Sequence, residues 1–453
     1  MSGVYGLMSE SQIPFESHPV ECYPKVMNRN VQVEIKSMAF KGYGVSRSGG
    51  KVLFIPYSVI GDKAWVEIVE EKKDYSFGRL SKLTAPSPWR ADPPCPYFGV
   101  CGGCQWQHID YSAHGGLKKE ILKEILKRLG GLEEIPPITV APSPDPYGYR
   151  VRVQLKGEGK AMGYHQERSH HVVDIDHCPI SHPLVNQMIL SFRRELPFFI
   201  QREEIEINVS PEEGKGIFIL HTRSLPERWK DLLEELLRAC SILKGCAIVR
   251  KNGLTLIGDP FLNFILSINR HREGRRLRLR TSPQSFFQVN LRQNEELIRT
   301  VLEFSDVKGG ERVLDLYAGI GNFTLPLAAE AKEVVGIEES RSAVEDACFN
   351  IEENGIRNCY FHHGRVEDLL KHGVTPGPDL IVLDPPRMGC KKITDQIADL
   401  KPKRIVYTSC EPTTFARDLR LFSKRGYRLR RLALIDMFPQ TYHMEVVGLL
   451  QRG

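Results

Sequence analysis

The sequence predicts a multidomain α/β protein in which a small N-terminal β-barrel precedes two larger α/β domains. The first observation is the length of 453 residues, which is too great for one ordinary hydrophobic core. The second is a run of short alternating stretches after residue 27, broken by glycine turns as in a small barrel. The third begins near residue 281, where apolar strands alternate with helical segments as in a doubly wound, Rossmann-like sheet.

Four segments are expected in order along the chain. Residues 1–26 show no periodicity and are expected to be a flexible arm. Residues 27–85 are expected to form an OB-like barrel, in which basic residues stand among aromatic ones such as Tyr43. Such a barrel can bind single-stranded nucleic acid or serve the fold alone. After a proline-rich linker, residues 86–280 are expected to form a central α/β domain, and residues 281–453 the Rossmann-like domain.

Composition and charge exclude several classes of protein. Hydrophobic residues make up 41% and charged residues 26% of the chain, as in a globular protein. The start of the chain lacks the basic and apolar regions of a signal peptide. No apolar run reaches the ~18 residues of a membrane span. We therefore expect a cytoplasmic protein without a membrane segment, whose 11 cysteines are not disulfides; nothing indicates an obligate protein partner.

A group of cysteines at the start of the expected central domain indicates a metal site. Three of them lie close together in "CPYFGVCGGCQWQH": Cys95, Cys101 and Cys104. The glycines between the last two let the loop turn, so that both sulfurs can reach one point. The best candidate for a fourth ligand is Cys178 in "DHCPI". Thiolates suit an iron–sulfur cluster or zinc, the spacing favours [4Fe-4S], and zinc could also recruit His108 or His177.

The stretch "ERVLDLYAGIGNFTLPLA" predicts a nucleoside-binding site at the end of a strand. Glycines after Asp315 let the backbone approach a ligand and let the next helix pack closely. The following strand ends at Glu338, whose carboxylate can accept hydrogen bonds from ribose hydroxyls. This combination resembles class I S-adenosylmethionine-dependent methyltransferases, and a nicotinamide site is the alternative.

A third apolar strand ends in "DPPR", from Asp384 to Arg387. The two prolines fix a rigid exit at the carboxyl end of the sheet, where ligands bind in open α/β folds. Amine methyltransferases use a related turn with an aromatic residue that stacks on the base. Arg387 stands in that place, and it suits contact with a phosphate or a carbonyl group.

Two further residues suggest the reaction. The strand "RIVYTS" ends on Cys410, which either packs in the core or presents its thiol to a substrate. Glu445 lies in an apolar strand and must be paired, protonated, functional or turned to water at an edge. Methylation of pyrimidine C5 needs a thiolate that adds to C6 of a flipped base, a methyl donor, and a base that removes the C5 proton.

Five stretches together resemble the RNA uracil-C5 methyltransferase family: "SFFQVN", "LDLYAGIGNF", "DPPR", "SCEPTTFARDL" and "DMFPQTYHMEVV". The resemblance covers nearly the whole chain. It implies that the barrel is a TRAM domain and that the four cysteines hold a [4Fe-4S] cluster, as in the 23S rRNA branch. It also implies that Cys410 is the nucleophile and Glu445 the general base. The implied residues for S-adenosylmethionine are Gln288, Tyr317, Asn322, Glu338 and Asp384.

Two residues depart from the pattern of that family: Glu411, and Gly364 in "FHHGRVED", where some relatives carry a polar residue that contacts adenine. Glu411 follows the expected nucleophile, where Asn is usual. A carboxylate at this position would disfavour the thiolate unless it points away or pairs with a base such as Arg417.

RNA is the expected partner. Basic stretches at residues 269–281 and 417–431 can neutralise phosphates, and Arg150 and Arg152 can line the RNA path. The expected reaction is methylation of a uridine in 23S rRNA to 5-methyluridine. Two alternatives stay open: the same chemistry on tRNA, and a metal-containing RNA-binding protein without turnover.

Overall fold

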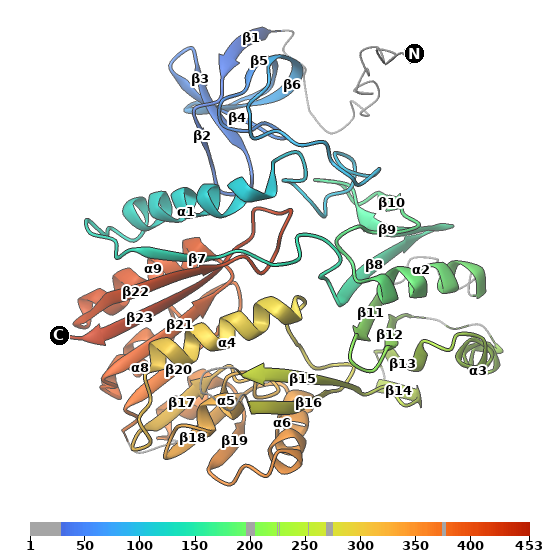
Figure 1. Cartoon of the computed structure of the whole chain (residues 1–453), viewed down its shortest axis with the longest axis vertical. Helices are drawn as coiled ribbons and strands as arrows, with labels where there is room; N and C mark the ends of the chain where they lie inside the picture. Colours follow the sequence, from blue (N-terminus) through green and yellow to red (C-terminus); the bar gives the residue numbers. More distant parts are fainter. Residues whose placement is uncertain are drawn as a thin grey trace, which may run out of the picture.

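A computed structural model describes residues 29–195, 204–223, 225, 227–251, 253–268, 275–373 and 377–453. The expected arm, residues 1–26, lies outside these residues. The described residues form sheets of six, seven, two and eight strands. The six-stranded sheet stands at one end of the molecule, above the seven-stranded and eight-stranded sheets, which lie side by side (Figure 1). This arrangement confirms the expected multidomain α/β fold with a β-rich N-terminal region.

The N-terminal sheet pairs in the order β1-β5-β6-β4-β3-β2. Its strands are β1 (Asn30–Glu34), β2 (Ser37–Met38), β3 (Gly44–Ser48), β4 (Lys51–Ile55), β5 (Lys63–Glu71) and β6 (Tyr75–Ala85). Alternating apolar residues such as Leu53 and Val66 point inward and form its core. Buried Asp62 forms an ion pair with Arg90 at 2.8 Å, which fixes the barrel to the segment that follows it.

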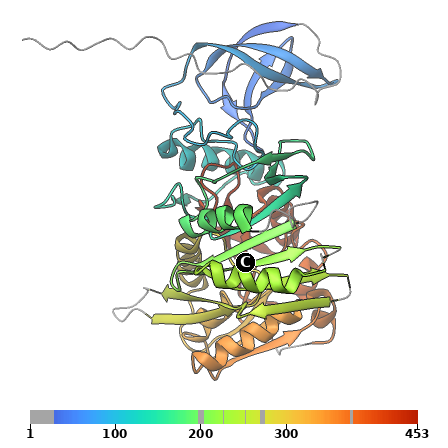
Figure 2. The same ribbon diagram turned by 90° about the vertical axis from the view of Figure 1, so that its right-hand side faces the viewer.

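The seven-stranded sheet has the order β10-β9-β8-β11-β12-β13-β14. Its strands are β8 (Arg152–Glu158), β9 (Ala161–His165), β10 (Val172–Asp174), β11 (Glu204–Ser210), β12 (Lys215–His221), β13 (Leu243–Arg250) and β14 (Gly253–Gly258). Helices α2 (Pro183–Glu195) and α3 (Trp229–Ala239) pack on its outer face (Figure 2). A separate hairpin of β15 (Leu262–Ile268) and β16 (Arg275–Thr281) leads toward the last sheet.

The eight-stranded sheet has the order β19-β18-β17-β20-β21-β23-β22-β7. Its strands are β7 (Ile138–Ala141), β17 (Arg312–Leu316), β18 (Glu333–Glu338), β19 (Cys359–His363), β20 (Leu380–Leu383), β21 (Arg404–Ser409), β22 (Tyr427–Ile435) and β23 (Glu445–Arg452). The helices that pack with it are α1 (Tyr111–Arg128), α4 (Leu291–Ser305), α5 (Thr324–Ala328), α6 (Arg341–Glu353), α7 (Val366–Lys371), α8 (Thr394–Asp399) and α9 (Pro412–Lys424). In the described ranges, no helix is both long and apolar enough to cross a membrane.

One strand of this sheet differs from the expected organisation. β7 lies in the range expected for the central domain, yet it pairs in parallel with β22 at the sheet edge. Helix α1 packs beside it against α9 (Figure 1). The local sequence of a parallel edge strand does not show which distant strand it pairs with. Composition alone therefore could not place β7 in this sheet.

The direction of the strands decides where the functional loops gather. β17, β18, β20 and β21 run parallel, so their carboxyl ends meet at one edge of the sheet. β23 runs antiparallel to both of its neighbours, and Val446 pairs with Ser409. The start of β23 therefore lies at the edge where β21 ends.

The close packing of β23 can be tested at Gly448. A Cβ atom added there would lie 2.7 Å from Cζ of Phe415 on α9, closer than normal contact. We expect Gly448→Ala to lower the free energy of unfolding by ~1–3 kcal/mol in urea denaturation. The added methyl group should cost less in a Phe415→Leu background, which shortens the opposing side chain. Equal costs in the two backgrounds would show that this contact does not exclude a side chain.

Candidate active site

Cys410 and Glu445 are brought together by the strand pairing. Cys410 directly follows β21, and Glu445 is the first residue of β23, the antiparallel neighbour of β21. Asp384 directly follows β20, on the other side of β21. Glu445 is only 2% exposed, and its Oε1 accepts no hydrogen bond from the part of the chain that the structure describes. A buried carboxylate oxygen without a partner is expensive, which makes Glu445 a candidate functional residue.

The pKa values of Cys410, Asp384 and Glu445 are all raised in the protein without ligands. Burial raises the pKa of the Cys410 thiol to about 12, and the charges of Glu445 and Asp384 act in the same direction. The Arg387 guanidinium acts in the opposite direction and favours the thiolate. Burial raises the pKa of Asp384 to about 7 and that of Glu445 well above its usual value. A cationic ligand beside these groups would lower all three pKa values.

The Glu411 carboxylate is held by hydrogen bonds from Thr413, at the start of α9. Its Oε1 accepts hydrogen bonds from the backbone N–H of Thr413 at 3.4 Å and from the Thr413 hydroxyl at 2.5 Å. Glu411 therefore caps the N-terminus of α9, where a negative charge is favourable. Arg417 pairs with Asp418 at 2.8 Å, so the expected alternative, a Glu411–Arg417 pair, is not what holds Glu411.

A cavity of about 80 Å³ lies at the carboxyl edge of the sheet, where Asp384 is one of its lining residues. It is lined by four of the five residues expected to bind the methyl donor: Gln288, Tyr317, Asn322 and Asp384. Glu338, the fifth, does not line it. The Glu338 carboxylate instead accepts hydrogen bonds from the backbone N–H groups of Gly319 at 3.0 Å and Ser340 at 2.6 Å. Glu338 thus shapes the glycine turn, since Gly319 does line the cavity.

Several walls of this cavity come from residues that the sequence reasoning missed. Asn294 on α4 exchanges two hydrogen bonds with Asn322, at 2.8 and 2.9 Å, and so fixes the orientation of that amide. The β15–β16 hairpin supplies apolar residues, among them Phe264, to the opposite wall. The sequence placed this hairpin in the central domain, and only the alternation in "LNFILSI" could have suggested a strand with an inward face.

Asp315 adds a further carboxyl group behind the glycine turn. It is fully buried, its Oδ2 accepts a hydrogen bond from the Thr324 hydroxyl at 2.5 Å, and burial raises its pKa to about 7. Asp384 and Glu338 raise that pKa further, because all three acids are close enough to repel one another. A site lined by acids suits a ligand with a positive charge, such as the sulfonium of S-adenosylmethionine.

Known proteins match this chain over most of its length. The model of the tRNA (uracil-5-)-methyltransferase family matches residues 110–371 and 378–453. An RNA methyltransferase of Aquifex aeolicus, described as uncharacterized, is 35% identical over 94% of this chain and 99% of its own. The 23S rRNA (uracil(1939)-C(5))-methyltransferase RlmD of Pectobacterium atrosepticum is 34% identical over 93% of each chain. The Pyrococcus abyssi tRNA (uracil-54, C5)-methyltransferase, crystallised with S-adenosyl-L-homocysteine, is 25% identical with a TM-score of 0.72, covering 92% of this chain and 99% of that chain.

The chain belongs to the tRNA (uracil-5-)-methyltransferase family. It is an S-adenosylmethionine-dependent RNA uracil-C5 methyltransferase. The family resemblance of the sequence motifs, the type of enzyme and the methyl donor are thereby confirmed.

The four cysteines of this methyltransferase line a second cavity of about 420 Å³. Burial raises the pKa of Cys101 to about 11 and also raises that of Cys104. His177 lines this cavity, whereas His108 is buried elsewhere with its Nε2 3.4 Å from the Ser58 carbonyl oxygen. Across the described ranges, no three His, Cys, Asp or Glu side chains are grouped closely enough to hold a metal ion. The expected metal site is therefore not shown by the structure.

The arginines expected to line an RNA path are mostly engaged. Arg152 forms an ion pair with Glu206 at 3.0 Å and lies over the ring of Phe286 at 5.3 Å. Phe286 is 60% exposed and borders both cavities. Residues 269–274 of the first basic stretch lie outside the described residues. Three arginines of β16 form ion pairs: Arg276 with Glu212, Arg278 with Glu353 and Arg280 with Asp346.

The raised pKa of Asp315 predicts a pH-dependent cost to stability. An unfolded Asp ionises near ~4, whereas Asp315 holds its proton to about pH 7 in the fold. The native protein therefore loses stability as the pH rises through this window. Asp315→Asn should gain stability relative to the native chain between about pH 4 and 7, by up to ~4 kcal/mol at ~1.4 kcal/mol per pKa unit. Thermal or urea unfolding across this range measures the gap, and a gap independent of pH would contradict the account.

Proposed function

We propose that the protein methylates C5 of a uridine in 23S rRNA, giving 5-methyluridine, with Cys410 as nucleophile and Glu445 as general base. The observation that carries the proposal is the convergence of Cys410, Glu445 and Asp384 at the ends of neighbouring strands, with Asp384 lining the cavity expected to hold the donor. Thiol, base and donor site are the three parts that C5 methylation requires.

The reaction begins at the thiol. Cys410 gives its proton to Asp384 and its Sγ adds to C6 of the flipped uracil, which moves the C5–C6 electron pair to an enolate at O4. Protonated Asp384, with a pKa of about 7, donates a hydrogen bond to this enolate. S-adenosylmethionine supplies the methyl group that C5 takes, and leaves as S-adenosylhomocysteine.

The last step belongs to Glu445. Its carboxylate removes the C5 proton, the electron pair restores the C5–C6 double bond, and the bond from C6 to Cys410 breaks with the thiolate as leaving group. The burial of Glu445 suits it to act as the general base, because a carboxylate with a raised pKa is the stronger base. Arg387 favours the thiolate at both ends of the cycle.

Ribosomal RNA is favoured over tRNA as the substrate by the relatives. Enzymes named for 23S rRNA uracil 1939 in Pectobacterium atrosepticum and Yersinia enterocolitica are 34% identical to this chain. The Pyrococcus abyssi enzyme named for tRNA is 25% identical. tRNA stays the alternative substrate, because the enzyme named for tRNA shares the fold of this chain.

The barrel is proposed to act as a TRAM domain that holds RNA. Its aromatic rings Tyr43, Phe54, Tyr75 and Phe77 lie 5.7–6.3 Å apart in a cluster. The guanidinium of Arg168 lies over two of these rings, and Tyr75 is 39% exposed. Bases can stack on such a surface without sequence preference.

The four cysteines are proposed to hold a [4Fe-4S] cluster. A single zinc ion requires four ligand atoms at ~2.0–2.3 Å from one point, and no described group is packed so tightly. A cluster spreads its ligands around a larger core, and the four thiols surround a cavity rather than a point. When bound, the cluster would supply Fe–S bonds that cross-link the loop of Cys95, Cys101 and Cys104 to Cys178.

A methyl-transfer assay tests the reaction. Label from radioactive S-adenosylmethionine should appear as 5-methyluridine in unmodified 23S rRNA, and Cys410→Ala should lower turnover by ~10³-fold or more because C5 is then not activated. Cys348→Ala, at an exposed cysteine on α6, is the matched control and should keep full activity. Label in tRNA alone would move the substrate, and full activity of Cys410→Ala would remove the thiol mechanism.

Glu445→Gln should block only the last step of the proposed reaction, the removal of the C5 proton. Addition and methyl transfer should still occur, but the C5 proton stays, so a covalent protein–RNA adduct should accumulate and survive denaturation. Denaturing gels with labelled RNA measure it. Absence of the adduct in this variant would count against Glu445 as the base.

Metal content tests the cluster. Protein purified without oxygen should be brown, absorb near ~400 nm and contain about four irons per chain. Cys104→Ser should lose iron and colour, while Cys348→Ala should retain both. Colourless protein with one zinc ion per chain would overturn the assignment.

A further inference from the structure

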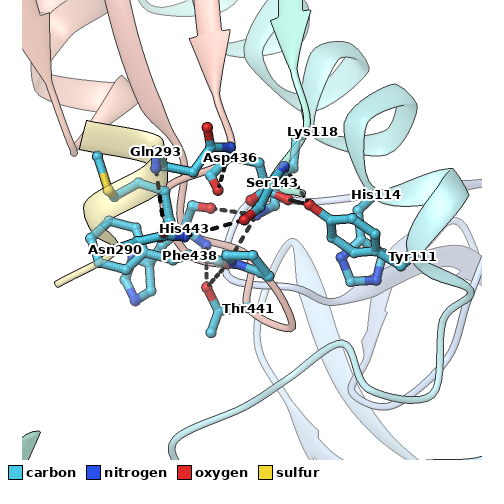
Figure 3. A network of polar contacts seen from close by, with 12 residues as sticks. Tyr111, His114, Lys118, Ser143, Asn290, Gln293, Asp436, Phe438, Thr441 and His443 are labelled. Carbon is cyan, nitrogen blue, oxygen red and sulfur yellow. Dashed lines mark hydrogen bonds and ion pairs between the residues drawn. The ribbon is translucent and has the colours of Figure 1, made fainter. Parts of the chain in front are cut away.

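The loop that carries Glu445 into the site is held by a buried lysine. Residues 436–444, the β22–β23 loop, connect the end of β22 to Glu445 at the start of β23. Lys118 on α1 reaches this loop with a side chain that is 0% exposed (Figure 3). Its Nζ is 2.6 Å from Oδ1 of Asp436, which is itself 1% exposed.

Lys118 joins both limbs of the loop at one atom. Its Nζ donates to the Phe438 carbonyl oxygen at 3.2 Å on the outgoing limb and to the His443 carbonyl oxygen at 2.6 Å on the returning limb. His443 lies two residues before Glu445, so this bond fixes the backbone from which β23 starts. The three donors of the ammonium thus have three acceptors, all of them in one loop.

Neighbouring groups hold the lysine and its partner in place. Tyr111, about two turns of α1 before Lys118, donates to Oδ2 of Asp436 at 2.8 Å, and its oxygen accepts the N–H of Ser143 at 2.7 Å. From the other side, Gln293 donates to the Asp436 carbonyl oxygen at 3.1 Å (Figure 3). The carboxylate therefore keeps two strong donors, which is what a buried ion pair requires.

Anchoring α1 does not account for this arrangement. The helix already packs through a buried apolar face that includes Ile121, Leu122 and Leu126. A buried ion pair is weak support for stability, since its desolvation opposes its attraction, but it can select one geometry among several. The bonds of Lys118 to two backbone carbonyls from opposite limbs define a geometry that packing alone would leave free.

We propose that Lys118 is a positioning residue for methyl transfer, which fixes the β22–β23 loop and so holds the Glu445 carboxylate where it can reach the C5 proton. The inference rests on the proposed role of Glu445 as base. Asp436 lies 2.6 Å from the Lys118 ammonium and balances its charge. Lys118 therefore acts on Glu445 through the position of the loop and not through its electric field. Displacement of Glu445 should slow the final elimination more than the addition, because Cys410 follows β21, whereas the three acceptors of Lys118 lie in the β22–β23 loop.

The experiment compares full-length variants. Lys118→Met keeps the length of the side chain and removes all three donors. Lys118→Met with Asp436→Asn also removes the carboxylate that would be left buried and unbalanced, which protects the fold. Arg404→Met is the matched control: Arg404 is a partly buried cation that bonds Glu311 and the Asp306 carbonyl oxygen at the opposite end of β21 from Cys410.

Each variant is measured for S-adenosylmethionine binding, kcat, KM for the RNA, and covalent adduct on denaturing gels, with Glu445→Gln as reference. We expect both Lys118 variants to bind the donor within ~2-fold of the native protein and to keep KM, while kcat falls by ~10- to 100-fold. Both should also accumulate the adduct that Glu445→Gln accumulates. Arg404→Met should lose stability without adduct.

Two results would overturn the inference alone. One is a folded double variant with native kcat and no adduct, while Glu445→Gln does form adduct. The other is a loss of donor binding in proportion to lost stability, as in the control, which would make Lys118 a purely structural residue. If Glu445→Gln itself forms no adduct, the proposed role of Glu445 fails, and the inference fails with it.

Discussion

The active site depends on one topological constraint, the insertion of antiparallel β23 between β21 and β22. In a fully parallel sheet, β23 would begin at the far edge, and Glu445 would lie a whole strand length from Cys410. The reversed strand places its first residue beside the last residue of β21. The hydrogen-bond ladder between β21 and β23 therefore brings the thiol and the carboxylate to the same edge of the sheet.

The same constraint creates an electrostatic problem. Besides burial, Asp384 raises the pKa of Glu445, and both acids raise the pKa of the Cys410 thiol, while Asp315 adds another acid behind the glycine turn. Protonation relieves the repulsion in the free protein. A bound sulfonium would lower these pKa values, because a positive charge favours the ionised form of each group.

The sequence predicted the parts of the site that follow directly from strand ends. Cys410, Asp384 and the glycine turn after Asp315 each terminate an apolar run, and such a run shows both the strand and where it stops. The pairing of β7 with β22, the hairpin wall with Phe264 and the contact of Asn294 with Asn322 could not be predicted, because they join segments with no shared pattern. Lys118 in "GLKKEILKEILK" reads as an ordinary surface lysine of an amphipathic helix, and only the fold shows that it is buried.

The β22–β23 loop shows how such long-range contacts add up to a defined position. The Gln440 carbonyl oxygen accepts the backbone N–H groups of Gln105 and Trp106, at 3.1 and 3.0 Å, directly after Cys104. The Tyr149 hydroxyl donates to the Pro439 carbonyl oxygen at 3.0 Å, and α1 holds the limbs through Lys118. The segment after Cys104, the segment before β8 and helix α1 thus each hold one carbonyl or more of the same nine-residue segment, 436–444. Because backbone carbonyls are held at both limbs and at the tip, the loop can shift only if several buried hydrogen bonds break together. Three distant segments thus hold the loop that leads into Glu445, and no single motif in the sequence encodes these contacts.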